Sequence, residues 1–241
     1  MTDRMCFWNE LPLSDRQILG RIGKRTHVHK GEVVFSAESP NLVIVMSGGW
    51  VRLQATSTSR ARTVIDIAGP GDPVSGLHAI EPVAPPWLGH LSAINGVSLT
   101  AGHVLTIGKD QIGVTLDKLP GLKEALIRSV GAQLHLATQL RLGADLPVRP
   151  RLAQLLLTMA HRFGERKVPT GGSVLAIPLS QPDLAAWIVA SPASVARALK
   201  AWRRDGVVAT GYASLSILDV KRLRNEAMST ATPLWKPPLW G

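Results

Sequence analysis

The segment from Leu179 to Lys200 brings together hydroxyl side chains and cations, the groups that bind phosphates and the edges of nucleic-acid bases. Ser180, with Asp183 three residues later, matches the capping box that opens a helix. Ser191, directly before a proline, opens a second helix in the same way. Two short, capped helices joined by a tight turn predict a helix-turn-helix.

The second of these helices is amphipathic. Val195, Leu199 and Trp202 share one face, which we expect to pack inward. The opposite face carries small and basic side chains, so Arg197 can pair with guanine O6 and N7 in the major groove or bind a phosphate. Arginines on a short helix are also often only solvated, which is the alternative interpretation. The candidate DNA-contacting residues are Ser180, Ser191, Ala193, Ser194, Arg197, Lys200, Arg203 and Arg204, the last three expected at phosphates.

Two further elements follow in the sequence. A small hairpin is predicted through Val207–Val208, Gly211–Tyr212 and Ser216–Leu218, and it would form the wing of a winged helix-turn-helix. Asp219 can then cap a final basic helix that holds Lys221, Arg222 and Arg224.

The excess of positive charge lies in the same half of the chain. The formal net charge is +10; residues 1–115 hold 10 Lys and Arg against 9 Asp and Glu, and residues 116–241 hold 17 against 8. A basic domain beside a nearly neutral one indicates that one half binds a polyanion. A surface that only confers solubility is the alternative.

The first half of the chain has a different pattern, in which short apolar stretches alternate with turn residues. Six strands are predicted at Val33–Phe35, Leu42–Met46, Trp50–Leu53, Val64–Ile67, Val97–Leu99 and Val104–Ile107. Gly31, Ser47–Gly49, Gly69–Gly71 and Gly102 separate them. Strands of this length and spacing are typical of a sandwich, barrel or roll.

Between the two halves, apolar residues recur at steps of three and four. The seam consists of Leu119, Leu122, Leu126, Val130, Leu134, Ala137 and Leu140, and the segment ends near residues 143–147. This predicts one long helix, and a second copy of the chain in parallel is the simplest partner for its seam. The alternative is a helix that packs only on its own domain. A further helix is predicted from Val148 to Phe163, closed by Gly164.

In this order, the elements resemble the Crp/Fnr superfamily. The resemblance rests on Lys30–Phe35, Val45–Leu53, Ala68–Asp72 and the helix-turn-helix. It implies an α+β chain: a jelly-roll-like, double-stranded β-roll sensor of the cyclic-nucleotide-binding type, a long dimerisation helix and a C-terminal winged helix-turn-helix. It also implies a transcription regulator that binds a roughly palindromic operator as a homodimer. The expected domains are residues 1–115, 116–146 and 147–228, followed by a Pro- and Trp-rich tail, 229–241.

The resemblance is incomplete at the effector pocket. In members that bind cyclic nucleotides, a Gly-Glu pair holds the ribose and an Arg-Ser or Arg-Thr pair holds the phosphate. At the corresponding places this chain has Gly71–Asp72 and Ser92–Ala93, with an apparent insertion at 80–87. Without the arginine, a buried phosphate would be unpaired, so cAMP or cGMP is not the expected effector.

The helix-turn-helix departs from the family too. The recognition helix commonly begins Ser-Arg-Glu-Thr, whereas Ser191–Ser194 reads Ser-Pro-Ala-Ser, so Arg197 is the base reader that remains. We therefore expect an operator unlike the usual one. Val189 occupies a turn position often filled by glycine, where φ is commonly positive.

Other functions have less support. Haem would need an axial ligand such as His78, with His90 and His103 nearby, but single histidines are more often structural. The one cysteine, Cys6, excludes an internal disulfide, a Cys-ligated cluster and a Cys-rich zinc site. No hydrolase triad, P-loop or HExxH pattern occurs, so an enzyme is not expected.

No cofactor and no metal are predicted, with a cyclic nucleotide or haem as the alternatives. The partners are double-stranded DNA, a second copy of the chain, RNA polymerase and a small-molecule effector, in the cytoplasm and without a membrane segment. The competing hypothesis is a small-molecule sensor whose C-terminal domain has lost specific DNA binding.

Overall fold

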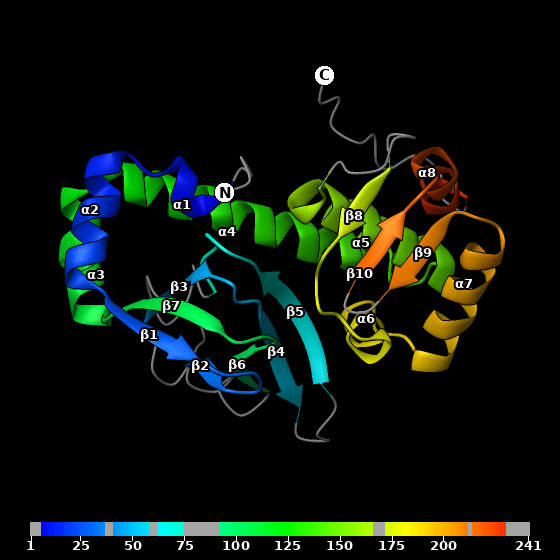
Figure 1. Cartoon of the computed structure of the whole chain (residues 1–241), viewed down its shortest axis with the longest axis horizontal. Helices are drawn as coiled ribbons and strands as arrows, with labels where there is room; N and C mark the ends of the chain where they lie inside the picture. Colours follow the sequence, from blue (N-terminus) through cyan, green and yellow to red (C-terminus); the bar gives the residue numbers. More distant parts are fainter. Residues whose placement is uncertain are drawn as a thin grey trace. The chain divides into compact units, whose positions relative to one another are not determined.

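The computed structural model describes residues 6–36, 41–57, 62–74, 92–165, 172–211 and 214–229. The chain divides into two compact units, Met1–Thr138 and Gln139–Gly241, and the division falls within helix α4 (Figure 1). The predictions made for His78, His90, the insertion at 80–87, Tyr212 and residues 230–241 lie outside the described residues.

The first unit contains two antiparallel sheets. The strands are β1 (Lys24–Val28), β2 (Val33–Ser36), β3 (Leu42–Ser47), β4 (Val51–Ser57), β5 (Arg62–Ala68), β6 (Ser92–Ser98) and β7 (Gly102–Ile107). One sheet has the order β1-β7-β3 and the other β2-β6-β4-β5. Side chains from both meet in one core, for example Val43 and Val104 of the first with Val51 and Leu53 of the second. The predicted N-terminal β domain is confirmed, and β1 is an addition to the six predicted strands.

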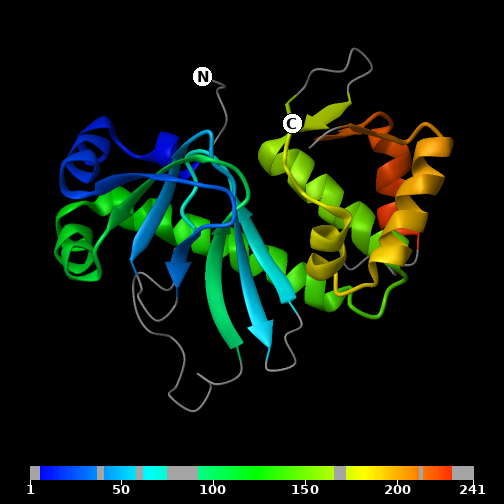
Figure 2. The ribbon, with the colours of Figure 1, turned by 60° about the horizontal axis from the view of Figure 1, so that its bottom comes forward.

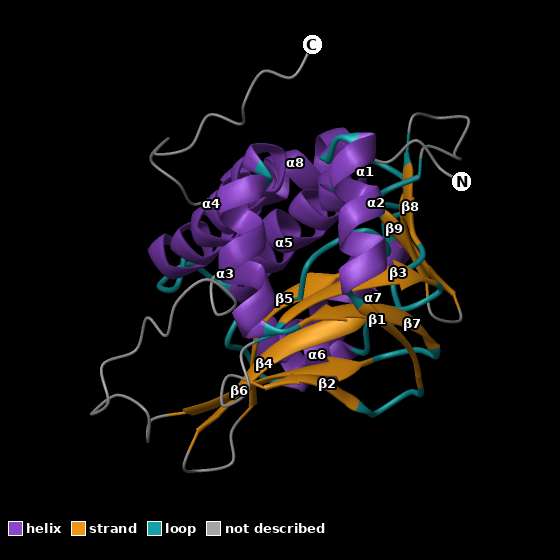
Figure 3. Cartoon of the chain, turned by 90° about the vertical axis from the view of Figure 1, so that its left-hand side faces the viewer, coloured by secondary structure: helices purple, strands orange, loops and turns teal. Residues whose placement is uncertain are grey.

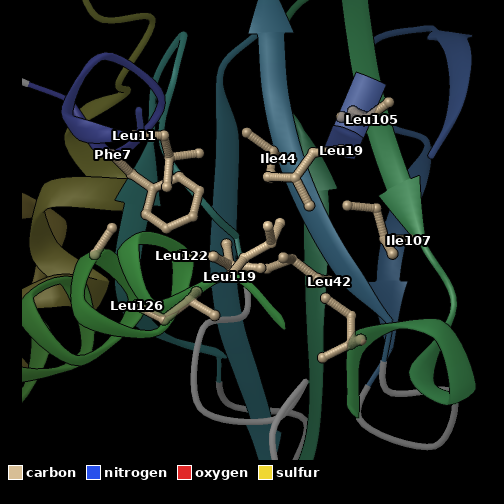
Figure 4. Close-up of a cluster of buried hydrophobic side chains, with 12 residues drawn as sticks. Phe7, Leu11, Leu19, Leu42, Ile44, Leu105, Ile107, Leu119, Leu122 and Leu126 are labelled. Carbon is tan, nitrogen blue, oxygen red and sulfur yellow. The ribbon is translucent and has the colours of Figure 1, made fainter. Parts of the chain in front are cut away.

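Helices cover the outer face of the three-stranded sheet, as Figure 3 shows. They are α1 (Phe7–Glu10), α2 (Leu13–Ile22), α3 (Lys109–Lys118) and α4 (Pro120–Leu142). Alternate residues of β3 and β7, such as Ile44 and Leu105, point into this layer and meet Leu19, Leu122 and Leu126 (Figure 4). Alternation along each strand therefore supplies two cores, one on each face of the sheet.

The predicted long helix differs from the structure in its start and in its seam. Leu119 ends α3 with φ −121° and ψ 84°, and Pro120 begins α4, because proline is tolerated in a first turn but not inside a helix. Leu122 and Leu126 are fully buried within the chain's own unit, whereas Leu134 is 66% exposed. Ile127, outside the predicted seam and seven residues before Leu134, is 60% exposed. The predicted single seam is wrong: α4 has an inner apolar face and a separate outer one.

The second unit is a helical bundle with a small sheet. Its elements are α5 (Val148–Phe163), β8 (Ser173–Leu175), α6 (Gln181–Trp187), α7 (Pro192–Arg204), β9 (Val208–Gly211), β10 (Ser214–Ile217) and α8 (Val220–Met228). The strands pair antiparallel in the order β8-β10-β9. Figure 2 shows α7 in orange beside α8 in red. The predicted α5, helix-turn-helix, hairpin and final helix are all present, while β8 was not predicted.

Candidate nucleic-acid interface

The two capped helices form as their sequence requires. The Asp183 carboxylate accepts hydrogen bonds from the Ser180 N–H at 3.0 Å and from the Ser180 hydroxyl at 2.6 Å. The Ser180 Oγ in turn accepts from the Asp183 N–H at 3.2 Å, which completes the capping box of α6. Ser191 caps α7 by accepting from the Ser194 N–H at 3.2 Å. These caps satisfy N–H groups that a helix start leaves free, reciprocally at α6 and by one bond at α7.

The turn between α6 and α7 keeps the backbone shape expected of a glycine, although a valine occupies it. Val189 has φ +52°, the one positive φ at a non-glycine among the described residues, and its side chain is 75% exposed. The Arg151 guanidinium donates to the Ile188 carbonyl at 2.6 Å, and the Ala190 N–H donates to the Ala185 carbonyl at 2.8 Å. Bonds on both sides of Val189 therefore hold the turn closed.

Helix α7 separates its apolar and basic side chains as predicted. Val195, Leu199 and Trp202 are at most 2% exposed. The outward face carries, in order along the helix, the exposed residues Ala193, Arg197, Lys200, Arg203 and Arg204. Arg197 donates to the Ser194 Oγ at 3.0 Å, which holds its guanidinium near the helix start. An exposed row of cations beside small side chains can reach a polyanion closely.

The basic residues of α7 differ in what holds them. Arg203 donates to Thr210 Oγ1 of β9 at 3.0 Å, so it lies on the side of the wing. Arg204 pairs with Asp205 at 3.0 Å. Seven of the eight candidate residues belong to α7 or to its N-cap, Ser191. The eighth, Ser180, is the exposed N-cap of α6.

A groove with a volume of about 770 Å³ runs along the side of α7 that lies opposite the wing. Its walls are the start of α5, the Ser194 and Arg197 side of α7, and α8. Arg149 of α5 and Arg222 of α8 line it together with Arg197. The sequence marks Arg222 as part of a basic helix, but the meeting of these three arginines depends on how the helices pack.

The four residues of the predicted effector pocket are not adjacent. Gly71 (φ +88°) donates its N–H to the Val45 carbonyl at 2.7 Å, and the Asp72 carboxylate accepts from the Gly69 N–H at 3.2 Å. This turn follows Ala68, which pairs with Val51 at one end of β4.

The other two residues predicted for that pocket, Ser92 and Ala93, are the first two residues of β6. Ser92 pairs with Ser57, at the far end of β4 from Val51, and Ala93 pairs with Thr56. Six residues of extended strand separate the two ends, about 20 Å. The Gly71–Asp72 turn and the Ser92–Ala93 backbone therefore do not meet at one point of the sheet.

Of the three histidines named for the haem alternative, His103 is the one that lies among the described residues. His103 is an exposed residue of β7, and its ring lies 5.1 Å from that of His27 on β1. In the part of the chain that the structure describes, no group of three or more His, Cys, Asp or Glu side chains is arranged to hold a metal ion.

Comparison with known proteins agrees with this architecture. Residues 150–226, which span the bundle from α5 to α8, match the model of the Crp-like helix-turn-helix domain. Over 200 residues the chain is 30% identical to the HTH-type transcriptional regulator Cmr of Mycobacterium tuberculosis, covering 82% of this chain and 73% of that protein. The chain belongs to the Crp/Fnr family of transcription regulators. It is thus a regulator with a helix-turn-helix DNA-binding domain.

Solved structures of the family share its fold. FixK2 from Bradyrhizobium japonicum superposes with a TM-score of 0.66 at 17% identity, covering 85% of this chain and 96% of that one. A CooA variant from Carboxydothermus hydrogenoformans superposes with a TM-score of 0.67 at 18% identity, covering 88% and 90%. Among the described residues of this Crp/Fnr protein, no helix is both long and apolar enough to span a bilayer.

Proposed function

We propose that this Crp/Fnr regulator acts as a homodimer in the cytoplasm and binds a roughly palindromic operator through the outward face of α7. The observation that carries the proposal is the row of exposed basic residues on α7, opposite the buried Val195, Leu199 and Trp202. Arg197 reads a base edge near the helix start, and Lys200, Arg203 and Arg204 contact phosphates farther along.

The outer face of α4 supports the dimer. Ile127 and Leu134 are 60% and 66% exposed and lie seven residues apart, with Gly131 and Thr138 between and after them on the same side. A heptad spacing of large apolar residues fits a parallel helix pair, and Gly131 allows close approach of the two backbones. Twofold symmetry of the pair then matches twofold symmetry of the operator.

DNA binding is tested by gel shift against the protein's own promoter region. We expect Arg197→Ala to lose about 1–3 kcal/mol of discrimination against random DNA, the contribution of a bidentate base contact. Arg224→Ala, which removes a charge from an exposed position of α8 outside the groove, is the control. If wild type and Arg197→Ala bind equally, with the salt dependence of random DNA, Arg197 has no reading role.

The dimer is tested by analytical ultracentrifugation of Leu134→Glu and of Ile127→Glu. Each places a charge in the proposed helix pair and should shift the protein toward monomer, because an unpaired buried charge is costly. Ala132→Glu, also exposed but on another side of α4, should leave the wild-type mass unchanged. A dimer that persists in both Leu134→Glu and Ile127→Glu would contradict pairing through this face.

We propose further that neither cAMP nor cGMP is the effector, and that RNA polymerase is a partner of the regulator. Isothermal calorimetry with both nucleotides should detect no binding, so clear micromolar binding would contradict this part. Mass spectrometry of small molecules that co-purify with the protein identifies the effector.

A second candidate function is a small-molecule sensor that has lost specific DNA binding. It is favoured by Ala193, which is exposed at a base-reading position but offers no polar group. Equal affinity of the wild type for its promoter and for random DNA would select this alternative.

A further inference from the structure

The groove beside α7 carries charge that the reading face does not account for. Its lining holds three arginines, Arg149, Arg197 and Arg222, and one carboxylate, Glu226, while a second carboxylate, that of Asp205, lies beside Arg222. Arg149 is bound to Glu226 by two hydrogen bonds and lies 5.8 Å above the Trp202 ring, so its position is fixed. Arg222, 53% exposed, forms an ion pair with the Asp205 carboxylate at 3.7 Å and donates a hydrogen bond to the Asp205 carbonyl at 3.3 Å.

The groove lies opposite the wing. Arg203 and its partner Thr210 mark the side of α7 on which β9 lies. Ser194, Ala198 and Ala201 mark the other side, where they line the groove. A helix in the major groove of DNA has one phosphate backbone on each side, about 12 Å apart. The wing can meet one backbone, and the groove is placed to meet the other.

We propose that this groove binds the sugar-phosphate backbone of one DNA strand, with Arg222 and the amide of Asn225 as phosphate contacts from α8. The inference rests on the proposed operator binding by α7. Its occupant follows from charge complementarity and from continuity with the reading face, because Arg197 and Ser194 belong to both surfaces. Helix α8 thereby becomes part of the DNA interface, although it follows the wing in sequence. Its contacts carry no sequence preference, since phosphates are the same at every base pair.

The test uses the full chain and fluorescence anisotropy with two duplexes, the promoter region and a random sequence. Arg222→Gln should weaken binding to both duplexes by the same factor, about tenfold, and reduce the salt slope by about one per subunit. Asn225→Asp places a negative charge in the groove without removing a bond of Arg222, and should weaken both duplexes as well. Arg224→Gln removes the same charge from the same helix outside the groove, and should change affinity less than twofold.

The outcomes separate this inference from the proposed function. If Arg222→Gln melts as the wild type does and binds both duplexes as Arg224→Gln does, the groove does not contact DNA. If the wild type fails to prefer its promoter, the operator proposal fails, while the effect of Arg222→Gln on random DNA still decides the groove. Inorganic pyrophosphate that raises the melting temperature of the wild type but not of Arg222→Gln, with DNA affinity unchanged, would assign the groove to small anions and overturn the inference.

Discussion

The Arg151 guanidinium donates a hydrogen bond of 2.6 Å to the Ile188 carbonyl, one residue before the left-handed Val189. A side chain of α5 thus fixes the turn of the helix-turn-helix. A β-branched residue at positive φ costs about 1–2 kcal/mol, so the turn is held against a local preference.

Val189→Gly should stabilise the protein. The glycine relieves the strained φ, and little packing is lost because the valine is 75% exposed. We expect the free energy of unfolding to rise by about 1 kcal/mol in urea denaturation, with DNA affinity unchanged. Val189→Ala keeps a Cβ at positive φ and should gain much less; an equal gain in both variants would mean that φ is not the cause.

Arg151→Met should destabilise the protein by about 1.5–3 kcal/mol, because the Ile188 carbonyl loses a charged donor. The turn is easier to hold with glycine at 189, so the same substitution should cost less in a Val189→Gly background. A double-mutant cycle in urea measures this coupling. Strict additivity of the two changes would show that Arg151 does not act on the turn.

Gly71→Ala tests the close contact between the turn that follows β5 and Cys6 in the N-terminal segment. A Cβ at Gly71 would lie 2.3 Å from the Cys6 Sγ, whereas a Cβ at Gly31, with nearly the same φ (+87° against +88°), meets no atom within 4 Å. Gly31→Ala should therefore cost about 1 kcal/mol for conformation alone, and Gly71→Ala at least twice as much. Thermal unfolding compares the two. Cys6→Ala should recover part of the extra cost, and its failure to do so would exclude this clash.

Ser191→Ala should weaken the start of α7. The hydroxyl accepts from the Ser194 N–H at 3.2 Å, and its loss should lower the free energy of unfolding by about 1 kcal/mol. Ser191→Gly, which also lacks the hydroxyl but suits the cap backbone, should cost only a few tenths. Denaturation curves that rank glycine below alanine would contradict a capping role.

Local chemistry explains which parts could be predicted from the sequence. The caps at Ser180, Ser191 and Asp219 involve partners three residues away, so their residue types are sufficient evidence. Strands such as Leu42–Ser47 were predictable because apolar residues lie between turn residues. Lys24–Val28 was missed since four of its five residues are polar and only Val28 is buried.

Features that depend on tertiary contacts could not be predicted from the sequence. The sequence does not show that Leu122 and Leu126 pack within their own unit while Leu134 stays exposed, because all three recur at multiples of four residues in one apolar pattern. Arg149 and Arg222 are 73 residues apart, and only the packing of α5 against α8 brings them to one groove. The distance between the Gly71 turn and Ser92 likewise depends on strand register.

The two apolar faces of α4 should separate mutant alleles into genetic classes. Substitutions at Leu122 or Leu126 remove buried contacts, so their products should be scarce in the cell and recessive. Substitutions at Ile127 or Leu134 leave a folded but unpaired chain, which should also be recessive. A chain altered only at Arg197 would still pair with wild-type subunits and would inactivate the mixed dimers. Its allele should therefore be dominant over the wild-type gene, which distinguishes a defect in α7 from a defect in either face of α4.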